Sequence, residues 1–222
     1  DRKKGLVNKG KRFLEGLACD PALRHARWRV FLTDRQRAEL FPPDVRAALT
    51  RPADAHIRGL FARAGERDPL ARSLYVDLKS YLCDDILTKV DRMSMAVSLE
   101  ARVPYLDLDL VALAFQVPSE LKLRGHRTKA ILKAVAARHV PADCVYRPKE
   151  GFSIPIKQWL KTRLRPLMED LLSGARLRQR GLFDPACVER LKRQHLAGTH
   201  NHSHTLWSLM VFEAWADQWL NP

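Results

Sequence analysis

Long apolar runs are missing from this sequence of 222 residues. No stretch approaches the roughly 20 consecutive apolar residues that cross a bilayer, and no signal-peptide pattern follows the first four residues. With 46% hydrophobic and 29% charged residues, the composition is that of an ordinary globular protein. We therefore expect no membrane segment and a cytoplasmic location. The start at Asp1, without Met, suggests a piece of a longer polypeptide.

Cysteine is scarce, and its spacing excludes two classes of protein. The four cysteines lie far apart and form no CxxC pair, so neither a zinc ribbon nor a small disulfide-rich secreted scaffold is indicated. We expect reduced thiols that are buried as small hydrophobic side chains. They are Cys19, Cys83, Cys144 and Cys187.

Acidic residues are few relative to basic ones: 25 against 39, which gives a net charge of +14. Nucleic-acid binding, attraction of an anionic substrate, or separation from acidic sequence could each explain this excess. The basic residues are spread along the chain, which argues against a single binding stripe. One short cluster, Arg176 to Arg180, stands between two glycines and predicts a solvated loop.

Alternating strand patterns are also absent, whereas apolar residues recur with helical period almost throughout. We therefore predict an all-α chain. Thr33 and Asp68, and the pair Asp84-Asp85, are expected to begin helices, and the tryptophans are expected in the core. The predicted helices cover residues 5–18, 20–32, 33–41, 43–50, 53–64, 69–82, 84–98, 106–117, 128–140, 155–172, 185–197 and 203–220.

The first motif is KVDRMSMAVSLEARVPYLD, residues 89–107. It predicts a helix that buries Val90, Met93 and Val97 and presents charge on its other side. Glu100 and Arg102 follow at the helix end, and a proline then stops the helix. A salt-bridged turn that orders two helices is the plain alternative to a functional role.

The second motif is LRGHRTKAIL, residues 123–132. Gly125 allows a backbone turn, and Thr128 is expected to cap the next helix. Arg124 and Lys129 are among four cations at that helix's N-terminal end, where free N–H groups already favour anions. A phosphate-facing role and a solvated basic loop are equally compatible with these residues.

The third motif is RPKEGFSIPIKQWL, residues 147–160. Pro148 and Gly151 predict a sharp loop whose apolar neighbours anchor it. Lys149 stands at its tip with Arg147 beside it. A rigid loop that presents two cations suits the neutralisation of a leaving pyrophosphate. A generic surface loop with solvated charges is the plain alternative.

These three motifs, in this order and spacing, resemble the C-terminal half of the synthetase domain of glutamine-hydrolysing asparagine synthetases. The specific motifs lie within residues 75–173, between a helical segment 1–74 and a helical cap 174–222. The resemblance implies the helical part of an adenine-nucleotide α-hydrolase-like α/β domain. It also implies that ATP and Mg²⁺ activate the aspartate side chain as an acyl-adenylate, which glutamine-derived ammonia attacks.

The resemblance implies a pyrophosphate-side catalytic role for Lys149 and weaker phosphate-side roles for Arg147, Lys129 and Arg124. Scaffolding is expected for the remaining motif residues. The nucleotide loop SGG-x-DS, the acidic motif GEG-x-DE and the N-terminal glutaminase cysteine are absent from the sequence. We therefore expect no tight cofactor binding and no turnover by this chain alone. The scaffolding residues are Asp91, Glu100, Arg102 and Asp107.

Other interpretations stay open. A related amidotransferase or lactam synthetase with another carboxylate substrate would use the same lysine, and the chain could form a homodimer. A basic helical nucleic-acid module needs a clustered basic face, which the sequence does not show. A metal site is not expected, since no carboxylate or cysteine accompanies the clustered histidines at ligand spacing. These are His195, His200, His202 and His204.

Overall fold

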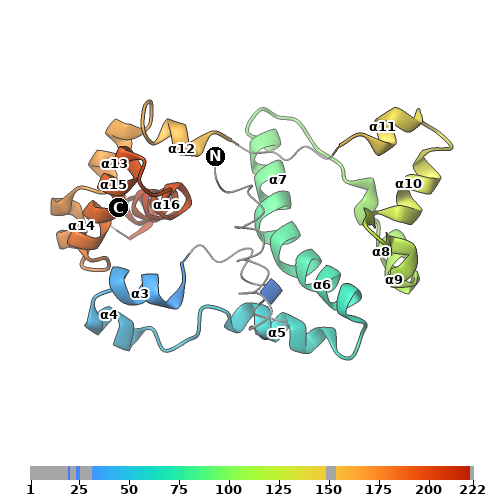
Figure 1. Cartoon of the computed structure of the whole chain (residues 1–222), viewed down its shortest axis with the longest axis horizontal. Helices are drawn as coiled ribbons and strands as arrows, with labels where there is room; N and C mark the ends of the chain where they lie inside the picture. Colours follow the sequence, from blue (N-terminus) through green and yellow to red (C-terminus); the bar gives the residue numbers. More distant parts are fainter. Residues whose placement is uncertain (1–19, 21–23, 26–31, 149–153, 221–222) are drawn as a thin grey trace. The chain divides into compact units, whose positions relative to one another are not determined.

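The computed structural model describes residues 20, 24–25, 32–148 and 154–220, which divide into two compact units. Unit 1 contains the described residues of Asp1–Ala26 and Ala53–Gly151, and unit 2 those of Arg27–Pro52 and Phe152–Pro222. The described part is mostly helical, and its strands are two residues long (Figure 1). The prediction of a helical chain is confirmed at this level. The predicted division into segments 1–74, 75–173 and 174–222 was drawn from the positions of the motifs and not from packing, and it stays a prediction.

Unit 2 is a group of helices around one apolar core, and its described helices are α3 (Asp34–Leu40), α4 (Pro43–Ala48), α12 (Ile156–Trp159), α13 (Arg165–Leu171), α14 (Gly174–Arg180), α15 (Pro185–Ala197) and α16 (Ser203–Trp219). The core side chains come from most of these helices. They include Leu40, Leu160, Met168, Leu172, Leu177, Val188, Leu206 and Met210, each at most 2% exposed.

Side-chain caps begin two of these helices, α3 and α15, at the starts that the sequence predicts. Thr33 and Gln36 form a capping box at α3. Asp184 accepts a hydrogen bond of 2.6 Å from the N–H of Cys187 at the start of α15, and the N–H of Asp184 donates to the carbonyl of Leu40. The caps therefore also join α15 to α3.

The predicted single helix over residues 155–172 is wrong, because the chain turns between α12 and α13. Pro166 lies in the first turn of α13. Inside a continuous helix its ring would clash with the preceding turn and its nitrogen could donate no hydrogen bond. The helix therefore restarts where proline is tolerated.

The predicted solvated loop at Arg176 to Arg180 is also wrong, since α14 occupies it. Leu177 anchors the helix in the core at 1% exposure. Arg180 lies 3.2 Å from Glu213 and 2.8 Å from Asp217, both on α16, and Arg176 also pairs with Asp217. These arginines therefore join two helices, and they are not solvated loop charges.

Two further polar side chains are buried between helices of unit 2. Lys192 donates to Glu169 and Glu189 at 2.9 and 2.8 Å; burial opposes the charged form, but these hydrogen bonds outweigh it and raise the pKa of Lys192. The N–H of His202 donates to Nδ1 of His195, so Nε2 of His195 carries the proton that bonds the carbonyl of Lys157. Burial lowers the pKa of His195, which keeps the ring neutral.

Unit 1 follows a different plan, and its described elements are α5 (Ala55–Ala64), α6 (Pro69–Asp77), η2 (Leu78–Leu87), α7 (Thr88–Met95), η3 (Pro104–Leu106), α8 (Leu108–Gln116), α9 (Ser119–Lys122), β1 (Leu123–Arg124), β2 (Arg127–Thr128), α10 (Ala130–Ala136) and α11 (Ala142–Tyr146). A small core joins α5 to α6. It consists of Leu60, Phe61 and Val76.

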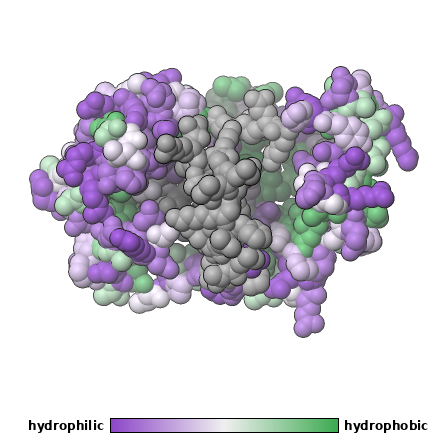
Figure 2. All heavy atoms as spheres, in the orientation of Figure 1, coloured by the Kyte–Doolittle hydropathy of each residue, from purple (hydrophilic) through white to green (hydrophobic). Residues whose placement is uncertain are grey.

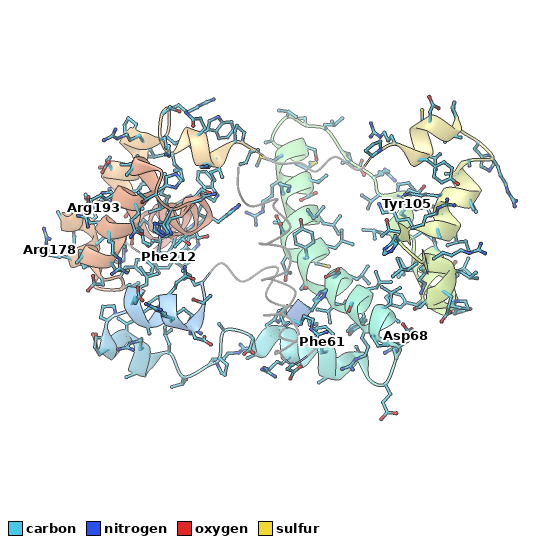
Figure 3. All side chains as sticks on the ribbon, in the orientation of Figure 1. Phe61, Asp68, Tyr105, Arg178, Arg193 and Phe212 are labelled. Carbon is cyan, nitrogen blue, oxygen red and sulfur yellow. The ribbon has the colours of Figure 1, made fainter. Side chains whose placement is uncertain are left out.

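Figure 1 shows α6 and α7 as one long helix, and η2 between them is a ten-residue π-helix. Asp68, labelled in Figure 3, begins it by accepting from the N–H groups of Leu70 and Ala71, as predicted. The expected second start at Asp84-Asp85 is wrong. Asp85 instead lies 3.9 Å from Lys89, one turn along the same continuous helix.

The motif-bearing part of unit 1 buries nothing: no residue from 81 to 148 is buried. Val90, Met93 and Val97, expected on a buried face, are 39%, 65% and 74% exposed. In Figure 2 green hydrophobic residues reach the drawn face in the part that carries α8 to α10. The apolar residues of these helices are therefore at most partly covered by the described residues.

Tryptophan and cysteine depart from expectation in both units. None of the described tryptophans is buried: Trp159 is half-buried, and Trp207, Trp215 and Trp219 are exposed. The free thiol of Cys187 is buried as expected, but Cys83 and Cys144 are exposed. The remaining positions, Trp28 and Cys19, lie outside the described residues. Among the described helices, none has the length and apolar character to cross a membrane.

Replacing Arg180 with alanine should strongly destabilise unit 2. The carboxylate of Glu213 is 0% exposed and one of its oxygens has no hydrogen-bond partner, so removal of the guanidinium leaves a buried charge with less compensation. We expect a loss of about 3 kcal/mol in the free energy of unfolding, measured by urea denaturation.

Arg178→Ala is the matched control, because Arg178 lies exposed on the outer side of the same helix (Figure 3). It should change stability by less than about 0.5 kcal/mol. Equal losses in the two variants would contradict a supporting role for the buried pair.

Candidate functional site

All seven described site residues lie in unit 1, on the segment from α7 to the end of α11. Lys149, the predicted catalytic residue, lies outside the described residues, so its prediction stays untested. Among the described residues, a shallow hollow at α3 and α4 in unit 2 contains none of the predicted residues. The geometry of the site is therefore that of the motif loops and their contacts.

The exit from α7 is a strained turn. Ser98 has a positive φ of 58°, and the N–H of Leu99 donates back to the carbonyl of Ser94. Glu100 and Arg102 then pair at 3.0 Å with both side chains largely exposed. An exposed pair of this kind adds little stability, so both groups stay accessible to a ligand or to another protein surface.

The two acidic residues that flank this turn are placed differently. Asp91 lies exposed in α7. Asp107 caps α8 by accepting from the N–H groups of Asp109 and Leu110, both at 3.1 Å. Tyr105 lies exposed just before this cap (Figure 3). Asp107 thus fixes the direction in which the chain leaves the first motif.

The second motif is a small hairpin. Arg124 of β1 pairs with Arg127 of β2, and Gly125, at φ +59°, begins the two-residue turn between them. Two-residue hairpin turns favour positive φ, which glycine adopts without cost. The predicted cap by Thr128 is wrong, since Thr128 pairs with Leu123 in the strand ladder.

Lys129 takes the cap position of α10 in a left-handed conformation, with φ 55° and ψ 38°. A side chain makes this conformation unfavourable by roughly 1–2 kcal/mol. Among the described residues, Ser98 and Lys129 are the non-glycine residues with positive φ, and each lies within a motif. Strain of this kind tends to gather at functional sites.

A cation–π contact joins the hairpin to the third motif. The guanidinium of Arg127 lies 5.4 Å from the ring centre of Tyr146, the residue just before Arg147. The contact brings the hairpin of Arg124 and the end of α11 together. Sequence reasoning missed this pair, because a contact across nineteen positions leaves no local pattern.

A second contact fixes the position of α9, the short helix that leads into the hairpin. The hydroxyl of Ser119, at the start of α9, donates to Asp68 over 2.7 Å. This hydrogen bond and those from Ala71 and Leu70 lower the pKa of Asp68. One carboxylate therefore caps α6 and also holds α9, from which the hairpin leaves.

The model of the asparagine synthase family matches residues 8–217 of this chain. The chain belongs to the asparagine synthase family. This membership confirms the resemblance that the three motifs carry, and it extends the match beyond the motif region into both units.

Curated relatives agree. A Mycobacterium tuberculosis protein named "Putative asparagine synthetase (glutamine-hydrolyzing)" is 38% identical over 157 residues, which are 70% of this chain and 24% of that protein. Asparagine synthetase (glutamine-hydrolyzing) 1 of Bacillus subtilis is 31% identical over 155 residues, with the same coverage. The chain thus spans about a quarter of the length of these relatives. No solved structure matched it.

The described residues include no group of three or more His, Cys, Asp or Glu that could hold a metal ion. The clustered histidines make other contacts instead. His195 bridges two backbone groups, and Nε2 of His202 lies 2.8 Å from the side-chain oxygen of Gln194. The rings of His200 and His202 stack at 5.6 Å.

Glycine at position 129 should be better tolerated than alanine. The left-handed backbone suits glycine and strains alanine, so we expect Lys129→Gly to be more stable than Lys129→Ala by about 1 kcal/mol. Amide hydrogen exchange of α10 in the complete polypeptide, where we expect this helix to be protected, measures this difference.

Lys133, inside the same helix, gives a control of opposite sign, since Lys133→Gly should be about 1 kcal/mol less stable than Lys133→Ala. If the alanine variant is more stable than the glycine variant at both positions, Lys129 does not hold the left-handed conformation.

Proposed function

We propose that this chain is the helical C-terminal part of the synthetase domain of an ATP-dependent amidotransferase that forms asparagine from aspartate. The observation that carries the proposal is the contact between the hairpin and the end of α11. It brings the phosphate-side candidates Arg124 and Arg147 into one region of a chain that belongs to the asparagine synthase family.

The proposed reaction has two steps. The side-chain carboxylate of aspartate attacks the α-phosphorus of ATP, which forms an acyl-adenylate and releases pyrophosphate. Ammonia released from glutamine then attacks the acyl carbon, and AMP leaves with its bonding electrons. Both steps depend on holding the reactants in line and on stabilising negative charge on phosphate oxygens.

The residues of this chain would act on the phosphate side. Lys149 would meet the departing pyrophosphate, and Arg147, two residues before it, would add a second positive charge to the same loop. Lys129 and Arg124 would face phosphate from the hairpin. The left-handed backbone of Lys129 supports this assignment. If the position served only to begin a helix, glycine would adopt the same conformation without strain, so we expect the lysine side chain to have a further role.

The remaining machinery would come from other parts of the polypeptide. We propose that the motif-bearing helices pack on the sheet of an adenine-nucleotide α-hydrolase-like fold, which supplies the nucleotide loop. The exposed apolar residues of α8 and α10 support this packing, since Leu113 and Val135 are 56% and 48% exposed. A separate domain would supply ammonia.

Mg²⁺ does not fit the described residues, since they offer no carboxylate cluster. We therefore derive no step through a metal held by this part of the chain. Substrate choice would also rest with other residues, so a related enzyme that activates another carboxylate would use the same cations. Aspartate is preferred on account of the curated relatives' names.

Lys149→Ala should lower the rate of aspartate-dependent adenylate formation at least tenfold, about 1.4 kcal/mol of lost transition-state stabilisation. The measurement is ATP–pyrophosphate exchange by the complete polypeptide, with glutamate in place of aspartate as a substrate control. The 222-residue chain alone should show no exchange.

Lys157→Ala is the matched control, because this lysine is exposed on α12 eight positions further on. It should leave the rate unchanged. A normal rate of pyrophosphate release by the Lys149→Ala variant would remove Lys149 from the mechanism. A rate of ATP–pyrophosphate exchange that does not depend on aspartate would refute the proposed substrate.

A further inference from the structure

The imidazole of His195 is fully buried, and the proposed reaction does not use it. His195 lies in the last turn of α15 and is 0% exposed. Its Nε2 donates to the carbonyl of Lys157 in α12 over 3.2 Å, and its Nδ1 accepts from the N–H of His202, the residue before α16, over 3.3 Å. One buried ring therefore joins α15 to α12 and to the start of α16 through their backbones.

Lys157 belongs to the third motif and stands eight positions after Lys149. The helix that contains it, α12, is four residues long, and so short a helix has little stability of its own. Ile156 and Leu160 hold this segment in the core of unit 2 by apolar burial, which is non-directional. Because hydrogen bonds are directional, the bond from His195 fixes the orientation of α12 on that core.

The end of α15 makes further contacts around this ring. Nζ of Lys161 donates to the carbonyl of Leu196 over 3.3 Å, so two successive residues of α15 hold the described end of the third motif. The N–H of His200 donates to the carbonyl of Gln194, and Nε2 of His202 lies 2.8 Å from the side-chain oxygen of Gln194. The turn that brings His202 to the buried ring is therefore itself held by hydrogen bonds.

Both backbone contacts of His195 require the neutral ring. A neutral imidazole offers one donor and one acceptor, whereas the charged ring offers two donors, so a proton on Nδ1 would face the N–H of His202. Burial lowers the pKa of His195; the bond to the carbonyl of Lys157 opposes this, and the charges of Lys161 and Lys157 lower it further. The pKa of His202 is also lowered, first by burial and then by three basic neighbours: His200, His195 and Arg190.

We propose that His195 is a positioning residue for the third motif. The neutral ring fixes α12 against α15 and the start of α16, whereas protonation of Nδ1 breaks the contact with His202 and loosens α12. The effect on catalysis rests on the proposed function, because His195 acts through the segment that carries Lys149. The joint between the helices belongs to unit 2 alone, so it is testable without the reaction.

His195→Gln tests the joint in the 222-residue chain, since glutamine keeps a donor and an acceptor but does not titrate. The pKa of His195 is lower in the folded chain than its ordinary value of about 6.5. The unfolded chain therefore binds more protons at low pH, and stability is lost as the pH falls below about 6.5.

Between about pH 7.5 and 5.5, the folding equilibrium constant of the unchanged chain should fall about three to ten times more than that of His195→Gln; tenfold is the limit at which the folded ring takes up no proton. Urea denaturation followed by tryptophan fluorescence measures this, because all five tryptophans lie in the sequence ranges of unit 2.

His204→Gln is the matched control, because His204 is exposed near the start of α16; it should keep the pH dependence of the unchanged chain. Nitrogen NMR of the ring gives a second measurement, in which Nε2 of His195 should carry the proton at neutral pH. A proton on Nδ1 instead, or equal pH dependence in His195→Gln and the unchanged chain, overturns the proposal.

His195→Leu tests the positioning role in the complete polypeptide, since leucine is apolar and forms neither hydrogen bond. In aspartate-dependent ATP–pyrophosphate exchange, the KM for pyrophosphate should rise at least about threefold while the KM for aspartate stays unchanged, and His195→Gln should remain within about twofold of the unchanged enzyme. A variant that merely loses folded protein would show a lower rate with both KM values unchanged.

An unchanged KM for pyrophosphate in His195→Leu would therefore overturn the positioning role. Exchange that is missing even from the unchanged polypeptide would refute the proposed function instead. In that case the pH dependence of the chain still decides whether a neutral His195 joins the helices.

Discussion

Burial of apolar surface, or its absence, sets what each part of this chain can do alone. In unit 2, side chains from most of the helices meet in one core, and even its buried charges have partners on neighbouring helices. From residue 81 to 148 no side chain is buried, although the helices there are as amphipathic as those of unit 2. Since apolar burial is the main favourable term in folding, the motif-bearing segment needs another surface to complete it.

Local contacts take over where the core is missing. Asp68 caps α6 and holds Ser119, Asp107 caps α8, and the stacking of Arg127 on Tyr146 joins two motifs. Each contact is worth at most about a kilocalorie or two in free energy, which can orient loops but cannot build a rigid site. These local contacts therefore orient the cations of the proposed phosphate side while the cations remain exposed, and packing on further protein would fix their positions.

Sequence reasoning succeeded where structure depends on neighbours in the chain. Thr33 and Asp68 begin helices because a side-chain oxygen and a free N–H lie within three residues of each other. It failed where contacts between residues far apart in the sequence determine the structure. The sequence alone predicts a solvated loop charge at Arg180, whereas in the structure this side chain pairs with Glu213. The exposure of Trp215 and of Met93 could not be predicted either, since periodicity reveals an apolar face but not whether anything covers it. For the site, the family and the candidate cations were found from motifs, whereas the Arg127–Tyr146 contact and the left-handed Lys129 required coordinates.

Hydrogen exchange of residues 81–148 tests most directly whether these helices need another surface. The amides of α8 and α10 would be followed in the 222-residue chain and in the polypeptide that carries the complete domain. The account predicts fast exchange in the chain alone and protection at least about a hundredfold greater in the complete polypeptide, because packing would add roughly 3 kcal/mol to local opening. Equal protection in both would show that these helices stand by themselves, and the proposed packing would then be wrong.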